Sequence, residues 1–367
     1  MGKIKAEHLF LAGDIGGTNT NLALVRHEGL NFDITFSMRF STQAEQSLLN
    51  PISRFLAQAE SKGFLGTIDS CCISGAGPVT NGSIQLTNAP WSIRAAEIAE
   101  QFDLEVHLIN DFTAISYAVV LLDPRDKKQI IHIPHTDGSA PMPGNGMALV
   151  VGAGTGLGVG FIDKRSDGSY QAFPSEGGHS GLPCFDELSE SFASWLRRKI
   201  GTEPGAELAI SGQGIVNIFD FLCSDQFGPT QAKPCAVSPD SGQSGLGPIA
   251  MQILGKPEQE RPALIAANKE KDFHCAQCME LFANFYARKI SNLAALFLPI
   301  GGIYLAGGIS TKNEAFLIEG HRFTKAFEQN YAPHIREFLT TVPVMIVRDY
   351  SISLIGAANA ALQLMRP

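Results

Sequence analysis

A unit made of a strand, a glycine-rich turn and a second strand occurs twice in this sequence. The first unit is HLFLAGDIGGTNTNLALV at residues 8–25, and the second is ALVVGAGTGLGVGFI at residues 148–162. When Gly17 is placed on Gly154, a threonine follows in both copies and the second apolar runs coincide. Such a repeat predicts two domains of common ancestry, each with a β-hairpin that has a glycine tip. The matching stretch is short, so coincidence is the alternative interpretation.

Helices and strands alternate after the first hairpin. Apolar residues recur at helical spacing over 47–62, a short apolar strand is predicted at 68–74, and a helix capped by Ser92 follows. A further strand at 106–109 ends in the dipeptide Asn110-Asp111, directly before another helical pattern. The alternation predicts an α/β fold, in which ligands bind beyond the carboxyl ends of strands. This dipeptide is expected at such an end.

The second half of the chain continues the alternation with one interruption. Residues 225–260 are rich in Pro, Gly, Ser and Gln without periodicity, which is typical of a loop or insertion. Helical spacing resumes over 273–298, and its apolar face suits a core helix and also an interface between two copies. A strand at 303–305 leads into a third glycine cluster, and a last helix is predicted over 356–364.

Composition narrows the class of protein. At 367 residues the chain suits two or three domains of roughly 100 to 200 residues each, and its 44% hydrophobic and 17% charged residues predict a globular core. A formal charge of -8 argues against a nucleic-acid binder, whose surface would be basic. The seven cysteines have no disulfide spacing, the start lacks the apolar region of a signal peptide, and no apolar stretch spans a membrane. We therefore expect a cytoplasmic protein without a membrane or nucleic-acid partner.

Three glycine clusters could hold a phosphate chain. They are GDIGGTN at residues 13–19, GAGTGLG at 152–158 and AGGI at 306–309. Glycine lets backbone N–H groups approach phosphate oxygens, and the adjoining threonine hydroxyls add donors. A plain hairpin turn would explain one such cluster better, but three clusters with carboxylates beside them favour a nucleoside triphosphate site. The sequence contains neither a P-loop motif nor a GxGxxG dinucleotide-binding motif.

Several polar side chains stand where phosphoryl transfer or sugar binding would need them. Asp14, among the first glycines, could hold a hydrated Mg²⁺, or it could form an Asx turn. Asp111 could accept a proton from a hydroxyl, or it could cap a helix. Glu176 and His179, on the loop EGGH, could bind adjacent hydroxyls of a polyol, or form a polar surface turn. The sequence has no HExxH motif that would support zinc binding at His179. The lone CxxC at 275–278 is better explained as two cysteines one helical turn apart.

Seven motifs occur in a fixed order along the chain: GDIGGTN (13–19), LTNAPW (86–91), INDFTA (109–114), GAGTGLG (152–158), EGGH (176–179), AELAISG (206–212) and AGGI (306–309). Together they resemble the bacterial-type glucokinase family, the non-ROK branch of the sugar kinase, heat-shock chaperone and actin superfamily. The resemblance covers nearly the whole chain. It implies a two-domain actin-like, ribonuclease H-like sugar kinase fold of the α/β class, with a cleft between the domains. The smaller domain is expected at 1–121 with 348–367, and the larger at 122–347.

By this resemblance the chain uses ATP to phosphorylate the 6-hydroxyl of glucose, giving glucose 6-phosphate and ADP. Asp111 would be the general base, Asp14 would hold Mg²⁺ through water, and the protein would be a cytoplasmic homodimer of glycolysis. The residues implied at the sugar are Asn88, Asn110, Asp111, Glu176, His179 and Glu207. The residues implied at the nucleotide are Asp14, Gly16, Gly17, Thr18, Asn19, Gly154, Thr155, Gly156, Gly307 and Gly308.

One departure from related sugar kinases concerns zinc. ROK kinases carry a cysteine cluster shortly after the ExGH loop, whereas this sequence has only Cys184 there, so no structural zinc is expected.

Two other functions stay open. One is a kinase-like sugar sensor without turnover, against which the presence of Asp111 argues, and the other is a kinase for another hexose or an acylhexosamine.

Overall fold

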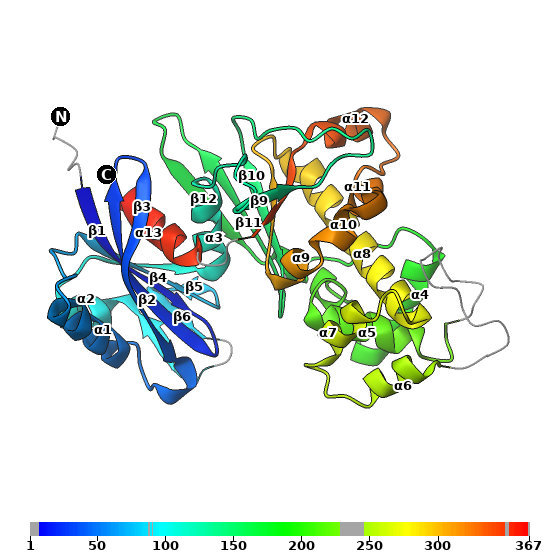
Figure 1. The fold of residues 1–367 in the computed structure, drawn as a ribbon, viewed down its shortest axis with the longest axis horizontal. Coiled ribbons are helices and arrows are strands. Elements are labelled where there is room, and N and C mark those ends of the chain that lie inside the picture. Colours follow the sequence, from blue (N-terminus) through cyan, green and yellow to red (C-terminus); the bar gives the residue numbers. More distant parts are fainter. Residues whose placement is uncertain (1–6, 87–88, 90, 228–245, 349–351, 366–367) are drawn as a thin grey trace. The chain divides into compact units, whose positions relative to one another are not determined.

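The structure, a computed structural model, describes residues 7–86, 89, 91–227, 246–348 and 352–365 (Figure 1). The chain forms two compact units. The first comprises Met1–Asp126, Gly160–Pro174 and Asp349–Pro367, and the second comprises Lys127–Val159 and Ser175–Arg348. The domain boundaries expected at 121 and 348 stay a prediction, because compactness does not show which residues move together.

The first unit is built on a five-stranded sheet with the order β3-β2-β1-β4-β8. Its first three strands are antiparallel neighbours, whereas β4 runs parallel to β1 and β8 runs parallel to β4. The predicted first hairpin and the two strands that follow it are confirmed. The strands are β1 (Glu7–Ile15), β2 (Asn19–Glu28), β3 (Asn31–Ser41), β4 (Ser70–Gly75) and β8 (Val106–Asn110).

The last helix of the chain belongs to the first unit. Helix α13 (Ile352–Leu364) packs on α3 (Asp111–Val119), and a Cβ at Gly356 would lie 1.9 Å from the Ala114 carbonyl oxygen. Asn359 Nδ2 donates to the Tyr117 carbonyl oxygen at 2.8 Å. Two further helices, α1 (Leu49–Ser61) and α2 (Ala95–Phe102), complete the unit. The close backbone approach at Gly356 therefore lets α13 pack directly against α3, the helix that begins at Asp111.

The expected helix cap at Ser92 is wrong. Ser92 instead begins β7 (Ser92–Arg94), which pairs with β6 (Ser83–Gln85) beside β5 (Val79–Thr80). Helix α2 starts after this strand and has no side-chain cap bond. Strand pairing places Ile93 opposite Ile84, with both side chains buried in the apolar core. The burial of Ile93 outweighs the local capping preference of serine.

A second sheet repeats the strand order of the first. Its order is β12-β11-β10-β13-β14-β9, and the division between the units falls within β11 and β12. The strands β10, β13 and β14 are parallel, and β9 is antiparallel to β14. The repeat therefore extends from one hairpin to five strands, which confirms the α/β class. The strands are β9 (Ile130–His132), β10 (Ala148–Ala153), β11 (Leu157–Lys164), β12 (Tyr170–Ser175), β13 (Ile303–Ala306) and β14 (Val344–Val347).

Helices make up most of the rest of the second unit. The predicted helix over 273–298 is confirmed as α8 (Phe273–Phe297), with Cys275 and Cys278 one turn apart in its buried part. Among the described residues, no helix combines the length and the apolar character needed to cross a membrane. The other helices are α4 (Glu187–Ile200), α5 (Gly212–Leu222), α6 (Pro248–Leu254), α7 (Arg261–Ala267), α9 (Gly308–Lys312), α10 (Glu314–Ile318), α11 (Arg322–Phe327) and α12 (Pro333–Thr341).

The loop expected over residues 225–260 is wrong for residues 248–254, which form α6. Pro248 stands in the first turn, where its missing N–H breaks no helical hydrogen bond. Ala250 and Ile253 are buried, so packing stabilises a helix too short for its periodicity to be recognised. Residues 228–245 lie outside the described part of the chain.

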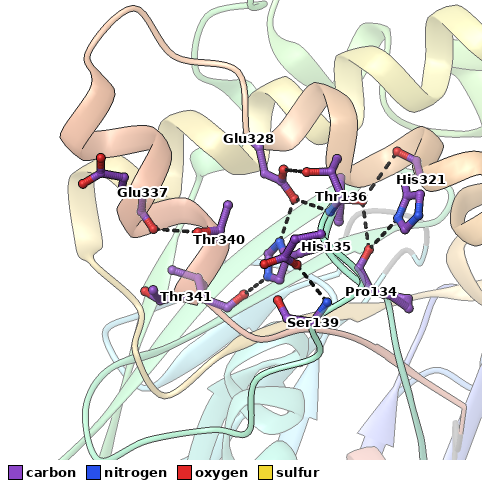
Figure 2. Close-up of polar contacts among 12 residues, drawn as sticks. Pro134, His135, Thr136, Ser139, His321, Glu328, Glu337, Thr340 and Thr341 are labelled. Carbon is purple, nitrogen blue, oxygen red and sulfur yellow. Dashed lines mark hydrogen bonds and ion pairs between the residues drawn. The ribbon is translucent and has the colours of Figure 1, made fainter.

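A fully buried histidine joins three segments of the second unit (Figure 2). His135 Nδ1 lies 2.8 Å from Glu328 Oε1, and His135 Nε2 lies 2.9 Å from the Val342 carbonyl oxygen. The N–H of Thr136 donates to Glu328 Oε1 at 3.1 Å, and the Thr136 hydroxyl donates to Oε2. Both ring nitrogens of His135 therefore lie within hydrogen-bond distance of an oxygen from a distant segment. The pair ties the loop after β9 to the end of α11 and to the start of β14.

Removal of this buried pair should destabilise the second unit. We expect His135→Leu to lower the free energy of unfolding by about 1 to 3 kcal/mol, because Glu328 and the Val342 carbonyl oxygen would lose a buried hydrogen-bond partner. Urea denaturation followed by circular dichroism measures this change. Arg197→Leu is the control, since it removes the exposed ion pair with Glu203 and should cost at most about 1 kcal/mol. Equal losses in the two variants would contradict a stabilising role for the buried contacts of His135.

Candidate active site

The dipeptide Asn110-Asp111 lies where β8 ends and α3 begins. Asn110 is the N-cap, and both Asn110 Oδ1 and Asp111 Oδ1 accept the N–H of Phe112 at 2.9 Å. Asn110 Nδ2 donates to the Gly77 carbonyl oxygen at 3.2 Å, which fixes the amide. Burial raises the pKa of Asp111 to about 6, and the negative charge of Asp14 adds to the rise. A carboxylate with such a pKa is ionised at neutral pH and accepts a proton more readily than an ordinary aspartate.

Asp14 lies at the same edge of the first sheet as Asp111. The registers place Ile15 beside Gly75 and Gly75 beside Asn110, so the carboxyl ends of β1, β4 and β8 are aligned. Ser353 Oγ donates to Asp14 Oδ2 at 3.0 Å, and Ser74 Oγ lies 3.5 Å from Oδ1. Burial raises the pKa of Asp14, and hydrogen bonds from Ser353 and its other polar neighbours partly oppose the rise. Two carboxylates in one partly buried region would attract a divalent cation.

The first glycine turn joins β1 to β2 next to Asp14. The N–H of Gly16 donates to the Asn19 carbonyl oxygen at 2.9 Å, and the Thr18 side chain is exposed. Arg39 on β3 donates from Nε to Asn19 Oδ1 at 2.9 Å, which brings a cation to the turn. The sequence carried no signal for Arg39, because the register of β2 with β3 places it there.

The second glycine turn joins β10 to β11 and is held by Glu207. The N–H of Gly154 donates to the Gly156 carbonyl oxygen at 2.9 Å, and Thr155 is exposed. Glu207 Oε2 accepts the N–H of Leu157 at 2.9 Å. A Cβ at Gly156 would lie 2.5 Å from the same oxygen, so only glycine lets the carboxylate approach. The structure therefore places Glu207, expected at the sugar, against the glycine turn of the nucleotide motif.

The loop EGGH presents two exposed polar side chains beside this turn. The side chains of Glu176 and His179 are 70% and 66% exposed, and Glu176 Oε2 lies 3.7 Å from His179 Nε2. Gly178, within the 3-10 turn η2 (Gly177–His179), is buried, and a Cβ there would lie 1.9 Å from the Leu157 carbonyl oxygen. The peptide groups of Leu157 thus join the loop, the glycine turn and Glu207. Both side chains are thus exposed to solvent beside the glycine turn.

The third glycine cluster lies next to the second. Strands β10 and β13 are parallel with Gly152 beside Ala306, so the chain leaves both strands at the same edge. Gly307 has a φ of +91°, and a Cβ there would lie 2.5 Å from the Ala153 carbonyl oxygen. Gly308 begins α9 directly after it. This close approach at a positive φ requires glycine at position 307.

The predicted residues thus assemble into two groups, one in each unit. Asn88 lies outside the described residues. The described part of the chain holds no cluster of three or more His, Cys, Asp or Glu side chains suited to a metal ion. Asp14 nevertheless fits Mg²⁺, which proteins commonly hold through one or two carboxylates together with waters and substrate phosphates. The first group contains Asp14, Gly16, Gly17, Thr18, Asn19, Asn110 and Asp111. The second contains Gly154, Thr155, Gly156, Glu176, His179, Glu207, Gly307 and Gly308.

Known proteins share this sequence and this fold. The family model described as glucokinase matches residues 11–364. A glucokinase from a Nostoc species is 32% identical over 363 residues, which cover 97% of this chain and 99% of the relative. The crystal structure of a glucokinase from an Antarctic psychrotroph has a TM-score of 0.76 and 25% identity, covering 98% of this chain and 99% of that one.

A more distant structure shares the fold alone. It is a ROK family glucokinase from Streptomyces griseus in complex with glucose and AMPPNP, with a TM-score of 0.57 and 19% identity. The alignment covers 97% of this chain and 99% of that one. The family model spans nearly all of the sequence, and the Nostoc relative spans it at a similar length. The chain belongs to the glucokinase family.

Proposed function

We propose that this protein transfers the γ-phosphoryl group of ATP to the 6-hydroxyl of glucose, which releases ADP and glucose 6-phosphate. Membership of the glucokinase family supports both substrates, and the Streptomyces griseus structure holds glucose with an ATP analogue. The observation that carries the proposal is the Asp111 carboxyl. It stands at the carboxyl end of β8, and its burial raises its pKa to about 6.

Asp111 is the general base in this proposal. The N–H of Phe112 fixes Oδ1, so we assign the accepted proton to Oδ2. As the bond between the sugar oxygen and phosphorus forms, the hydroxyl proton moves to the carboxylate, and ADP leaves with the electrons of the broken bond. Proton acceptance at neutral pH is easier for this group than for an exposed aspartate because its pKa is closer to 7.

The sugar hydroxyls are assigned to Asn88, Asn110, Glu176, His179 and Glu207. The exposure of Glu176 and His179 supports this role, because both can reach a ligand without a change in the core. Glu207 Oε2 is bound to Leu157, so we assign the sugar to Oε1. Carboxylates and imidazole nitrogens match the alternating donors and acceptors of a polyol.

The nucleotide is assigned to the three glycine clusters. Exposed Thr18 and Thr155 on the two turns support contacts to phosphate oxygens, with Gly307 and Gly308 at the adenosine. Mg²⁺ held at Asp14 would supply positive charge for the phosphate oxygens when bound. The domains proposed here are residues 1–121 with 348–367 and residues 122–347, and exclusion of water from the bound substrates would prevent hydrolysis of ATP.

The setting of the reaction belongs to the same proposal. Free thiols throughout the described residues support a reducing compartment, and we place the protein in the cytoplasm as a kinase of glycolysis.

Residues Phe282, Phe285 and Tyr286 on α8 are buried within the second unit and are not available to a partner. The exposed Leu296, with Leu298 and Ile300, supports a homodimer contact at the end of that helix instead.

Loss of the base should reduce turnover and leave glucose affinity nearly unchanged. We expect Asp111→Asn to lower kcat by about 10² to 10⁴, the range typical of lost general-base catalysis. In the unaltered enzyme kcat/KM should fall as the pH drops through about 6, because the protonated carboxyl cannot accept a proton. A coupled ADP-release assay over pH 5 to 8 measures both effects. Asp103→Asn, at the exposed end of α2, is the control, and wild-type turnover in Asp111→Asn would remove Asp111 from catalysis.

The two groups of residues should affect different substrates. Asp14→Asn should raise the KM for MgATP about 10-fold or more with a smaller change for glucose, because it removes a charge at the metal. Glu176→Gln and His179→Ala should raise the KM for glucose instead. Initial rates measured with each substrate varied in turn separate these effects. The same panel with other hexoses and acylhexosamines defines the sugar, and a shift in MgATP use by Glu176→Gln would contradict the assignment.

The homodimer should depend on the apolar end of α8. Light scattering at micromolar protein should give twice the mass of one chain, and Leu296→Asp should shift the mass toward one chain. The control is Tyr331→Asp, an exposed apolar residue on another segment. A single-chain mass for the unaltered protein would reject the dimer.

A further inference from the structure

A lysine is buried in the middle of α8, within the second unit. Lys289 is only 5% exposed, and the residues around it on the helix bury mainly apolar side chains. Burial lowers the pKa of Lys289, and no charged neighbour among the described residues contributes to that shift. A buried ammonium is costly, so its presence requires a polar partner.

The partner of this ammonium is Ser180, the residue directly after the EGGH loop. Lys289 Nζ donates to Ser180 Oγ, although the two residues are far apart in the sequence. The Ser180 hydroxyl donates its single hydrogen to the Gly177 carbonyl oxygen at 2.7 Å. Its lone pairs therefore accept from the ammonium, and each hydrogen bond in the chain strengthens the other.

Ser180 also contacts the turn that contains Glu207, another residue assigned to the sugar. Its carbonyl oxygen accepts the N–H of Ala206 at 2.8 Å, at the start of the 3-10 turn η3 (Ala206–Leu208) that contains Glu207. Gly181 forms an isolated bridge with Gly205 next to this bond. One serine thus holds the turn of Glu176 and His179 with its hydroxyl, and the turn of Glu207 with its main chain.

We infer that Lys289 is a positioning residue for glucose: through Ser180 it holds the loop of Glu176 and His179, and beside it the turn of Glu207, in the arrangement that binds the sugar. The inference rests on the proposed function for the identity of the sugar. The side chains of Glu176 and His179 are exposed, so packing of these two side chains does not fix their positions. A contact from the rigid helix α8 orders the loop of Glu176 and His179 before glucose binds, so less conformational freedom is lost on binding.

Lys289→Met tests the inference because it keeps the length of the side chain and removes the ammonium. The variant should fold normally, since replacing a buried charge with an apolar group removes a desolvation cost. We expect the KM for glucose to rise about 10-fold, with kcat and the KM for MgATP changed less than about twofold. Ser180→Ala should give a similar rise, and the double variant should add little to either single change. Ser180→Thr, which keeps the hydroxyl, should recover most of the loss.

Arg288→Met is the matched control on the same helix. Arg288 donates to the main-chain oxygens of Gln329 and Ala326, so its loss disturbs the contact of α8 with α11 and not the sugar loop. Hydrogen exchange of the peptide containing residues 176–180 should rise in Lys289→Met and stay unchanged in Arg288→Met. This second readout needs no turnover.

The outcomes separate the two proposals. A wild-type glucose KM in Lys289→Met, or equal effects of Lys289→Met and Arg288→Met, would overturn the positioning role. Absence of glucose phosphorylation by the unaltered protein would refute the proposed function. In that case the exchange experiment still decides whether Lys289 orders the loop, and unchanged exchange in Lys289→Met would overturn the inference by itself.

Discussion

The peptide groups on either side of Leu157 are the point on which the second unit's candidate site depends. Glu207 accepts the N–H of Leu157, while Gly178 approaches its carbonyl oxygen so closely that a Cβ would lie 1.9 Å away. The glycine turn, the EGGH loop and Glu207 therefore share one short stretch of backbone. A displacement of this backbone would move the residues assigned to the phosphates and to the sugar together. Such coupling would suit phosphoryl transfer, in which the distance between donor and acceptor must be controlled.

The candidate residues of the two units lie in different electrostatic environments. Asp14 and Asp111 are partly buried, and the first sheet aligns the strand ends that carry them, so burial raises the pKa of each carboxyl. Glu176 and His179 stand exposed on a loop. Burial tunes a group for proton transfer, whereas exposure keeps a group available to a ligand. This contrast supports the separate roles that we propose for the two sets.

Much of the architecture could be predicted from local sequence. The hairpins, the strand before Asn110 and the long helix α8 are confirmed, because each has a strong periodic pattern or a glycine turn between apolar runs. Local signals were misleading at Ser92, where strand pairing buries Ile93, and at α6, which is only seven residues long. Both errors occurred where packing with distant residues outweighed a weak local preference.

The sequence by itself determined the α/β class, because the spacing of apolar residues and the placement of glycines are local properties that indicate strands, turns and helix starts. Its motifs also carried the resemblance to the glucokinase family. Only the tertiary structure decided which of these residues share an environment. The pairing of Lys289 with Ser180, the contact of Glu207 with Leu157 and the approach of Arg39 to Asn19 join segments distant in the chain. Strand register and helix packing place these partners together, and burial raises the pKa of Asp111, so neither effect could be read from the order of residues alone.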